Sequence, residues 1–98
     1  MAQRSHYILE IDFDETIRRR ELLVRKAVGD LIRTQRKKQL SGLTQEKLAG
    51  LSEISFEHLN HIENHKATAS LEVLDRIAKA LGYHRLSDFL ALDEHQIL

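Results

Sequence analysis

Cysteine, proline and tryptophan are absent from this chain of 98 residues, and glycine occurs only four times. Without cysteine there is no disulfide and no thiolate metal site, which fits a reducing compartment. The scarcity of helix-breaking residues favours an all-helical body. No apolar run of about 18 residues is present to cross a bilayer, and the first residues do not resemble a secretion signal. We therefore expect a cytoplasmic protein without a membrane-spanning segment.

Charge of one sign is not in excess either, because 15 Lys and Arg balance 15 Asp and Glu. A net charge of zero weakens the case for nucleic-acid binding, since phosphate contact draws on a basic surface. The distribution is uneven, however. Residues 17–40 hold nine basic side chains against two acidic ones, Glu21 and Asp30, which leaves a local surplus of seven. Such a run is a solvated face in most helical proteins, whereas beside a DNA-binding motif it can contact the phosphate backbone.

Signs of catalysis are also lacking. The sequence has no cysteine nucleophile, no glycine-rich phosphate loop, and no Ser, His and acid arrangement in a recognisable setting. We expect neither an enzyme nor a bound cofactor. The length suits one small domain and is too short for a separate sensing domain, so no small-molecule ligand is expected.

The first residues show an alternating pattern that is typical of a β-strand with one apolar face. A lone strand is unstable, so it needs a partner from a second copy of the chain or a helical groove to lie on. We favour pairing across a homodimer, and we divide the chain into an arm at residues 1–15 and a helical domain at residues 16–98. The apolar residues of the alternation are Tyr7, Leu9, Ile11 and Phe13.

From Thr16 onward the apolar spacing becomes helical, which predicts a helix over about residues 16–38, with Gly29 weakening its middle. A later helix is expected to begin after Ser70 and to stop at Gly82. Its inward apolar stripe is expected to consist of Leu71, Leu74, Ile77, Ala78 and Leu81. Ser87 is the expected cap of a last helix. The sequence thus indicates five or six helices.

Residues 43–66 carry the most specific pattern, namely two short helices joined by a tight turn. Thr44 and Ser55 are placed to cap the two helices with their hydroxyl groups. In the first helix an apolar face is expected from Leu48, Ala49 and Leu51, and Ser52 with Glu53 would make the turn. In the second helix Leu59 and Ile62 point inward. This arrangement is that of a DNA-reading helix-turn-helix.

The outward side of the second helix supplies the candidate base-reading residues. The Phe56 ring can contact a thymine methyl group, unless a neighbouring helix or subunit covers it, and Glu57 can accept from the amino group of cytosine, unless it is a spacer charge. Asn60 and His61 can donate to base edges or to phosphates. The four candidates are Phe56, Glu57, Asn60 and His61.

The same stretch resembles the Cro and phage-repressor (XRE-type) family of helix-turn-helix regulators, through Thr-Gln-Glu-Lys-Leu-Ala at residues 44–49 and Ile-Glu-Asn-His-Lys at residues 62–66. The resemblance covers about residues 27–90 and implies a compact lambda-repressor-like domain. Glu53 and His65 stand where the family usually carries glycine. If their backbone is left-handed, each costs about 1 kcal/mol.

The resemblance also implies contacts with the DNA backbone near the two helix starts and in the loop after the second helix. It matches Arg36 and Glu63 to positions that pair in some relatives, and it leaves the arginines at 18–20 behind the reading helices. The basic side chains that lead into the first reading helix are added because of their charge. The candidate phosphate contacts are Thr44, Gln45, Ser55, Asn64, Lys66, Arg36, Lys37 and Lys38.

Three histidines, His58, His61 and His65, are spaced by three and four residues, which is compatible with one helical edge. A zinc site there would require His65 to lie within the helix, and it falls past the expected end, so no metal is expected. We favour imidazoles that gain charge beside phosphate as the pH falls from about 8 to 6.

These patterns lead to one preferred function and two alternatives. The preferred function is a bacterial or phage DNA-binding regulator, a repressor that acts as a homodimer on double-stranded DNA. The first alternative is an antitoxin that binds a toxin protein and its own operator. The second is a helix-turn-helix that serves only protein contact.

Overall fold

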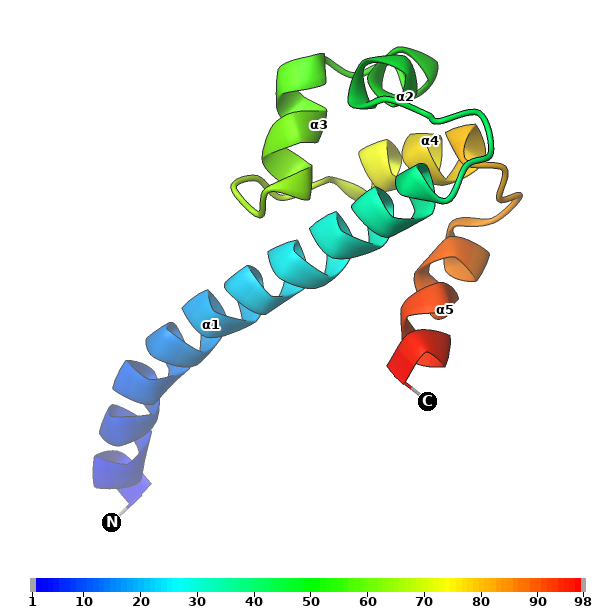
Figure 1. Cartoon of the computed structure of the whole chain (residues 1–98). Helices are drawn as coiled ribbons and strands as arrows, with labels where there is room; N and C mark the ends of the chain where they lie inside the picture. Colours follow the sequence, from blue (N-terminus) through cyan, green and yellow to red (C-terminus); the bar gives the residue numbers. More distant parts are fainter. Residues whose placement is uncertain (1, 98) are drawn as a thin grey trace.

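The structure of the protein is a computed structural model that describes residues 14–91. This part of the chain contains five α-helices and no strand (Figure 1), so the all-helical prediction is confirmed. The predicted strand with Tyr7, Leu9, Ile11 and Phe13 lies outside the described residues, and it stays a prediction together with the division into arm and domain. The helices are α1 (Ala2–Lys37), α2 (Gln45–Leu51), α3 (Phe56–Glu63), α4 (Leu71–Ala80) and α5 (Leu86–Ile97).

The hydrophobic core lies where the last turns of α1 meet the other helices. In Figure 1, α2 and α3 lie above the end of α1, α4 lies just below α2, and α5 lies below them at the right. Helix α3 packs on both α1 and α2, and α5 packs on α4 and α1. The residues expected to point inward are buried except at the ends of two helices. Leu71, which was expected in the stripe of α4, is 71% exposed, so that part of the prediction is wrong. At 3.6 residues per turn, Leu71 points roughly 70° away from the centre of the buried side of α4. The core consists of Leu31, Ile32, Leu48, Ala49, Leu59, Ile62, Leu74, Ile77, Ala78, Leu81 and Phe89.

Leu51 is a second exception, because its side chain is 63% exposed. The prediction that it belongs to the apolar face of α2 is wrong. The inward face of α2 is centred between Leu48 and Ala49 and continues to the buried Ser52. At 3.6 residues per turn, Leu51 points roughly 110° away from that centre.

Short-range capping bonds set the starts of three helices. The hydroxyl oxygens of Thr44, Ser55 and Ser70 each accept from the backbone N–H three residues later, at 3.1, 3.0 and 3.1 Å. Each such cap contributes about 1 kcal/mol. All three predicted caps are confirmed. Ser87 does not cap α5, because the helix begins at Leu86 and the N–H of Asp88 bonds to the carbonyl of Arg85.

Left-handed residues end two of the short helices. Glu53 has a φ of 57° and His65 a φ of 66°, and both follow a helix end as the first residue of the turn. The residue after each of them bonds back to the preceding helix: the N–H of Ile54 donates to the Ala49 carbonyl, and the N–H of Lys66 donates to the His61 carbonyl. This pairing is the Schellman motif, which favours glycine at the left-handed position. The positions where the family usually has glycine therefore do take a left-handed backbone here.

Glu53→Gly is expected to raise the free energy of unfolding by about 1 kcal/mol, because glycine carries no Cβ penalty at positive φ. Glu53 is exposed, so the substitution removes little packing. The measurement is urea unfolding followed by circular dichroism. Glu53→Ala is the control, since it removes the same side chain but keeps the penalty. Equal stability of the two variants would contradict a strained turn.

In the described part of the chain, no helix is both long and apolar enough to span a membrane.

Candidate nucleic-acid interface

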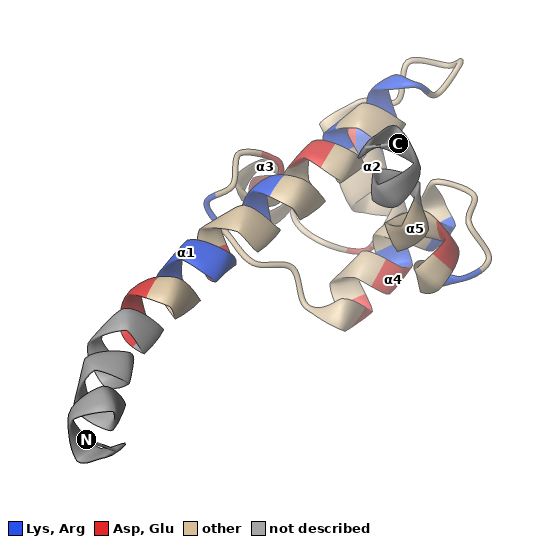
Figure 2. Ribbon diagram, turned by 90° about the horizontal axis from the view of Figure 1, so that it is seen from below, with Lys and Arg blue, Asp and Glu red and all other residues tan. Residues whose placement is uncertain are grey.

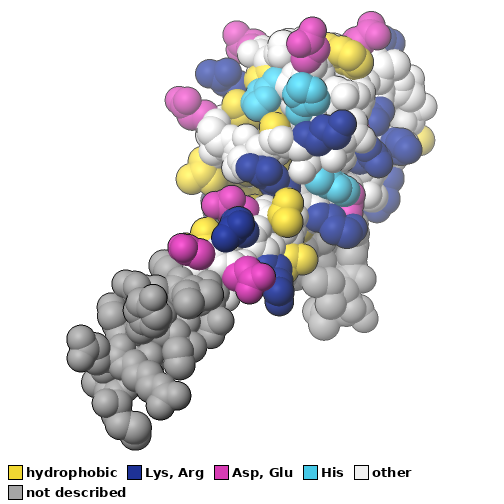
Figure 3. All heavy atoms as spheres, turned by 90° about the vertical axis from the view of Figure 1, so that its left-hand side faces the viewer, with side chains coloured by type: hydrophobic (Ala, Val, Ile, Leu, Met, Phe, Trp, Pro, Cys, Tyr) yellow, Lys and Arg dark blue, Asp and Glu magenta, His cyan; other side chains and the backbone are white. Residues whose placement is uncertain are grey.

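Helix α3 presents one open face to solvent and buries the other. Leu59, Ile62 and Glu63 face the interior, while Phe56, at 45% exposure, stands outside the core. Glu57 and His61 are exposed, and Asn60 is half-buried. Figure 3 shows this side of the molecule, where histidine and basic side chains lie among scattered acidic ones. The structure therefore gathers the four candidate base-reading residues on one face, and their contact with bases stays a prediction.

A buried carboxylate at the end of α3 fixes that helix to α1. The Glu63 side chain is fully buried, and Arg36 is 12% exposed. Arg36 donates to both carboxylate oxygens, from Nε at 2.8 Å and from Nη2 at 2.9 Å. Its remaining terminal nitrogen donates to the Leu43 carbonyl at 3.1 Å, which ties down the loop before α2. The pairing that the family resemblance implies is present as a two-pronged, charge-assisted contact.

Two amide side chains connect this carboxylate to the open face of α3. Gln45, the first residue of α2, donates from Nε2 to Glu63 Oε1 at 2.9 Å. Its carbonyl oxygen accepts from Asn60 Nδ2 at 3.0 Å. Asn64 then donates to the side-chain and backbone oxygens of Asn60, at 3.2 and 2.9 Å. In the free protein, the side chains of Gln45 and Asn60 are thus already hydrogen-bonded within the domain. To contact DNA, each side chain has to use its remaining donors and acceptors or break one of these bonds.

Arg33 completes the polar network, and no sequence motif singles it out as a site residue. Arg33 donates from Nη2 to the side-chain oxygen Oδ1 of Asn64 at 2.8 Å and to the backbone carbonyl of Glu63 at 3.2 Å. Its position three residues before Arg36 on the same helix was the available signal, because residues three apart share one edge of a helix. We call the six residues of this cluster the Glu63 network: Arg33, Arg36, Gln45, Asn60, Glu63 and Asn64.

The remaining candidate phosphate contacts divide into two groups. Lys37 and Lys38 at the end of α1, and Lys66 after α3, are exposed and can reach a ligand. Thr44 and Ser55 are also exposed, but their oxygens already accept from their own helices, which leaves only the hydroxyl proton to donate. Arg36 has little surface left for a phosphate because it is committed to Glu63. The contacts of these residues with phosphate stay predictions.

A second polar contact holds the loop after α3 against α1. His65 Nε2 lies 2.7 Å from Asp30 Oδ1, and Lys26 Nζ lies 2.9 Å from the other carboxylate oxygen. The bond from Lys26 is the main cause that lowers the pKa of Asp30; burial opposes the shift, and the bond from His65 adds to it. Asp30 is therefore held in its charged form.

Because its pKa is lowered in the folded state, Asp30 contributes stability that is present above its ordinary pKa and is lost as the pH falls through the lowered value. We expect acid unfolding of Asp30→Asn to show a smaller loss between pH 5 and 2 than that of the unmodified chain. The difference should be a fraction of a kcal/mol, since the side chain is 43% exposed. Urea unfolding at each pH measures it, and parallel curves for the two proteins would contradict this role.

The three histidines do not share one helical edge. His65 lies beyond the end of α3 and bonds to Asp30, whereas His58 and His61 stay on the helix. Within residues 14–91 no group of three or more potential ligands is placed to hold a metal ion.

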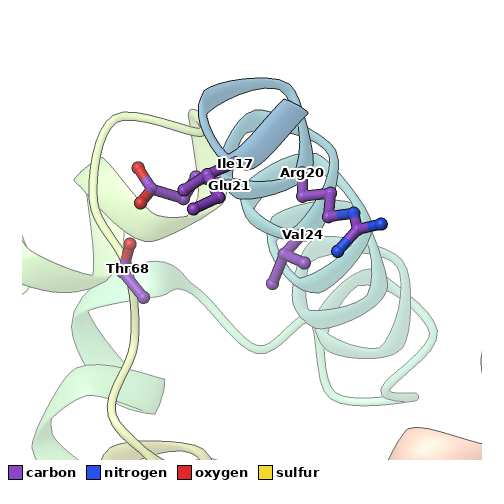
Figure 4. Close-up of a pocket in the computed structure, with 5 residues that line it drawn as sticks. All are labelled: Ile17, Arg20, Glu21, Val24 and Thr68. Carbon is purple, nitrogen blue, oxygen red and sulfur yellow. The ribbon is translucent and has the colours of Figure 1, made fainter. Parts of the chain in front are cut away.

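One shallow hollow lies between α1 and the loop that follows α3 (Figure 4), with a volume of about 230 Å³. Ile17, Val24 and Thr68 contribute its apolar wall, with Arg20 and Glu21 beside them. It contains none of the candidate DNA-contacting residues.

Comparisons with known proteins agree with this geometry. A family model described as helix-turn-helix matches residues 32–86, more than half of the chain. An uncharacterized HTH-type transcriptional regulator from Methanothermobacter thermautotrophicus is 39% identical over 64 residues, which cover 65% of this chain and 90% of the relative. No solved structure gives a significant match.

Proposed function

Since the chain belongs to the Cro/C1-type (XRE) helix-turn-helix family of DNA-binding transcriptional regulators, we propose that it is a sequence-specific repressor that binds its operator as a homodimer. Family membership places it among regulators rather than enzymes. The finer statements, repression and a homodimer, are our proposal. The observation that carries it is the open face of α3, held at a fixed angle by the Glu63 network.

The rigid mounting of α3 supports sequence-specific reading. A recognition helix has to enter the major groove with its side chains already in place, because each mobile group that becomes ordered on binding lowers the affinity. The Glu63 network joins α3 to both α1 and α2, so the helix cannot turn independently of the domain. The backbone that carries Phe56, Glu57 and His61 is therefore held in a fixed position relative to the rest of the domain.

Each exposed residue type has a matching partner in the groove. His61 can donate to a purine acceptor, Phe56 can lie against a thymine methyl group, and Glu57 can accept from cytosine. Glu57 would repel a phosphate that came close, which favours selective over indiscriminate binding. Lys66 and Asn64, in the loop after α3, are exposed and suit contact with the flanking backbone.

A homodimer is proposed because one short helix reads only a few base pairs. Helix α3 contains eight residues, and its exposed face offers three or four side chains to the groove. Two copies related by a two-fold axis would read two half-sites about one helical turn apart, roughly 34 Å. The total number of base contacts, and with it the specificity, would double.

The test is selection of bound duplexes from a pool of random sequences, using the full chain. We expect an inverted repeat to emerge whose half-sites are spaced by about one turn of DNA. A single unrepeated half-site would contradict the homodimer, and absence of any enriched sequence would contradict sequence-specific binding. In the latter case a helix-turn-helix used for protein contact alone would be favoured.

A second candidate function, that of an antitoxin, is favoured by one specific observation. Leu22, Leu23 and Val24 on α1 are each more than half exposed, which is more apolar surface than a solvated helix needs. A toxin protein could cover this surface while α3 remains open. Copurification with a toxic protein encoded next to this chain, abolished by Leu23→Lys, would support this function. If this chain formed no complex with that toxic protein, the antitoxin function would be contradicted.

A further inference from the structure

The loop between α3 and α4, residues 64–70, runs alongside the middle of α1. Three pairs of side chains join the two segments, and their α1 members span residues 25–33. At 1.5 Å per residue this is about 12 Å of α1. The pairs are Arg33 Nη2 with Asn64 Oδ1 at 2.8 Å, Asp30 Oδ1 with His65 Nε2 at 2.7 Å, and Arg25 Nε with Thr68 Oγ1 at 2.9 Å.

Figure 1 shows α3, this loop and the middle of α1 on the same left-hand side of the molecule. Figure 3 looks directly at that side, and basic side chains continue from the region of α3 down onto α1. The surface that would face DNA in the proposed function therefore does not end with the helix-turn-helix. It includes α1 near Arg25.

Arg25 is held in a way that leaves its strongest anion-binding groups available. The bond to Thr68 uses Nε, which carries one of the five N–H groups of the guanidinium. The other four belong to the two terminal nitrogens, which form the fork that binds phosphate in a bidentate manner. Among the ion pairs of residues 14–91, none involves Arg25. Thr68 thus orients the guanidinium without neutralising it.

The surroundings of Arg25 are basic on balance. Lys66 is exposed and lies two residues before Thr68, so their Cα atoms are at most about 7 Å apart. Arg18 lies two helical turns from Arg25 on the same side of α1, about 10 Å further along. The nearby acids are Glu21, whose carboxylate points toward the loop in Figure 4, and Asp30, which is paired with Lys26 and bonded to His65.

We propose that Arg25 binds a backbone phosphate next to the one held by Lys66, so that the DNA-contacting surface extends from the helix-turn-helix onto α1. This inference rests on the proposed function. It differs from what the family resemblance implies, which keeps the first helix behind the reading pair. It also shows how a chain of zero net charge can bind a polyanion, because the contact relies on a local basic surface.

The experiment measures how the affinity for a mixed-sequence duplex of about 30 base pairs depends on salt, which requires no knowledge of the operator. Each phosphate contact contributes about 0.9 to the slope of log K against log salt. Arg25→Gln keeps a donor for Thr68 but removes the charge, and it is expected to lower the slope by about 0.9 per bound protomer. At 0.1 M salt that contact corresponds to roughly an eightfold loss of affinity.

Arg25→Lys keeps the charge and should retain the slope of the unmodified chain. Arg85→Gln is the matched control, because its segment between α4 and α5 lies on the opposite side of the molecule from α3 in Figures 1 and 2. It should leave the slope unchanged. Far-UV circular dichroism of each variant verifies that the helices are intact.

Two results would overturn the inference. One is a slope for Arg25→Gln equal to that of the unmodified chain. The other is an equal loss in Arg25→Gln and Arg25→Lys, which would trace the effect to the fastening of the loop rather than to charge. In both cases a reduced slope for Lys66→Gln would show that duplex binding through the loop after α3, on which the proposed function depends, is intact. Absence of salt-dependent duplex binding by the unmodified, folded chain would instead contradict the proposed function itself.

Discussion

Glu63→Ala is expected to lower the free energy of unfolding by about 3–5 kcal/mol, because it leaves the largely buried Arg36 guanidinium without its carboxylate. The same change removes the acceptor of Gln45, whose bond to Asn60 then loses its support. Small domains have a total stability of about 5–15 kcal/mol. We therefore expect the variant to be partly unfolded at room temperature, as measured by urea unfolding at pH 7.

The double variant Arg36→Met with Glu63→Leu separates the charge from the packing. It removes both charges while it keeps side chains of similar length, and it should recover most of the stability that Glu63→Ala loses. Glu63→Gln keeps the shape but not the charge, and it should cost less than Glu63→Ala. If Glu63→Gln cost no stability at all, the ionic role of the network would be contradicted.

Gly29→Ala is expected to destabilise the protein by about 2 kcal/mol, although alanine is the better helix former by about 1 kcal/mol. Gly29 lies at the crossing of α1 and α3. A Cβ at this position would overlap the Ile62 carbonyl oxygen and would come within 2.9 Å of the His65 ring and 3.3 Å of the Glu63 carbonyl oxygen. Two of these three atoms belong to the backbone, so α3 itself would have to move.

Gly50→Ala is the matched control, because Gly50 lies in α2 and a Cβ there meets no atom within 4 Å. It should stabilise the protein by about 1 kcal/mol through helix propensity alone. Thermal unfolding of both variants measures the contrast. Equal gains for the two alanines would mean that the close approach of α1 and α3 does not require glycine.

The features that the sequence predicted well are local. The caps at Thr44, Ser55 and Ser70 depend on a hydroxyl and an N–H three residues apart, and the left-handed turns at Glu53 and His65 depend on the residues next to them. The spacing of apolar residues likewise predicted the buried side of each long helix. The predictions for Leu51, Leu71 and Ser87 are wrong, and all three residues lie at a helix end, where the side chain's direction depends on where the helix begins or stops.

Contacts between distant segments were harder to foresee. The Arg36–Glu63 pair was proposed only through the family resemblance, and the part of Gln45 and Asn60 in the same network was not proposed at all. These contacts bring together residues 15–27 positions apart. In the sequence, Gly29 indicates only a weak point of a helix. Its role depends on the carbonyl groups of α3, which no pattern near residue 29 reveals.

In the proposed function, the open face of α3 reads base pairs. The most direct measurement compares His61→Ala and Lys66→Glu on the selected operator duplex and on its single-base-pair variants. His61→Ala should remove about 1–3 kcal/mol of discrimination at one or two positions of each half-site, whereas Lys66→Glu should weaken binding to every duplex alike. Two results would contradict base reading by α3 through His61. One is that His61→Ala weakens binding to every duplex alike. The other is that the variant still discriminates fully between the operator and its single-base-pair variants.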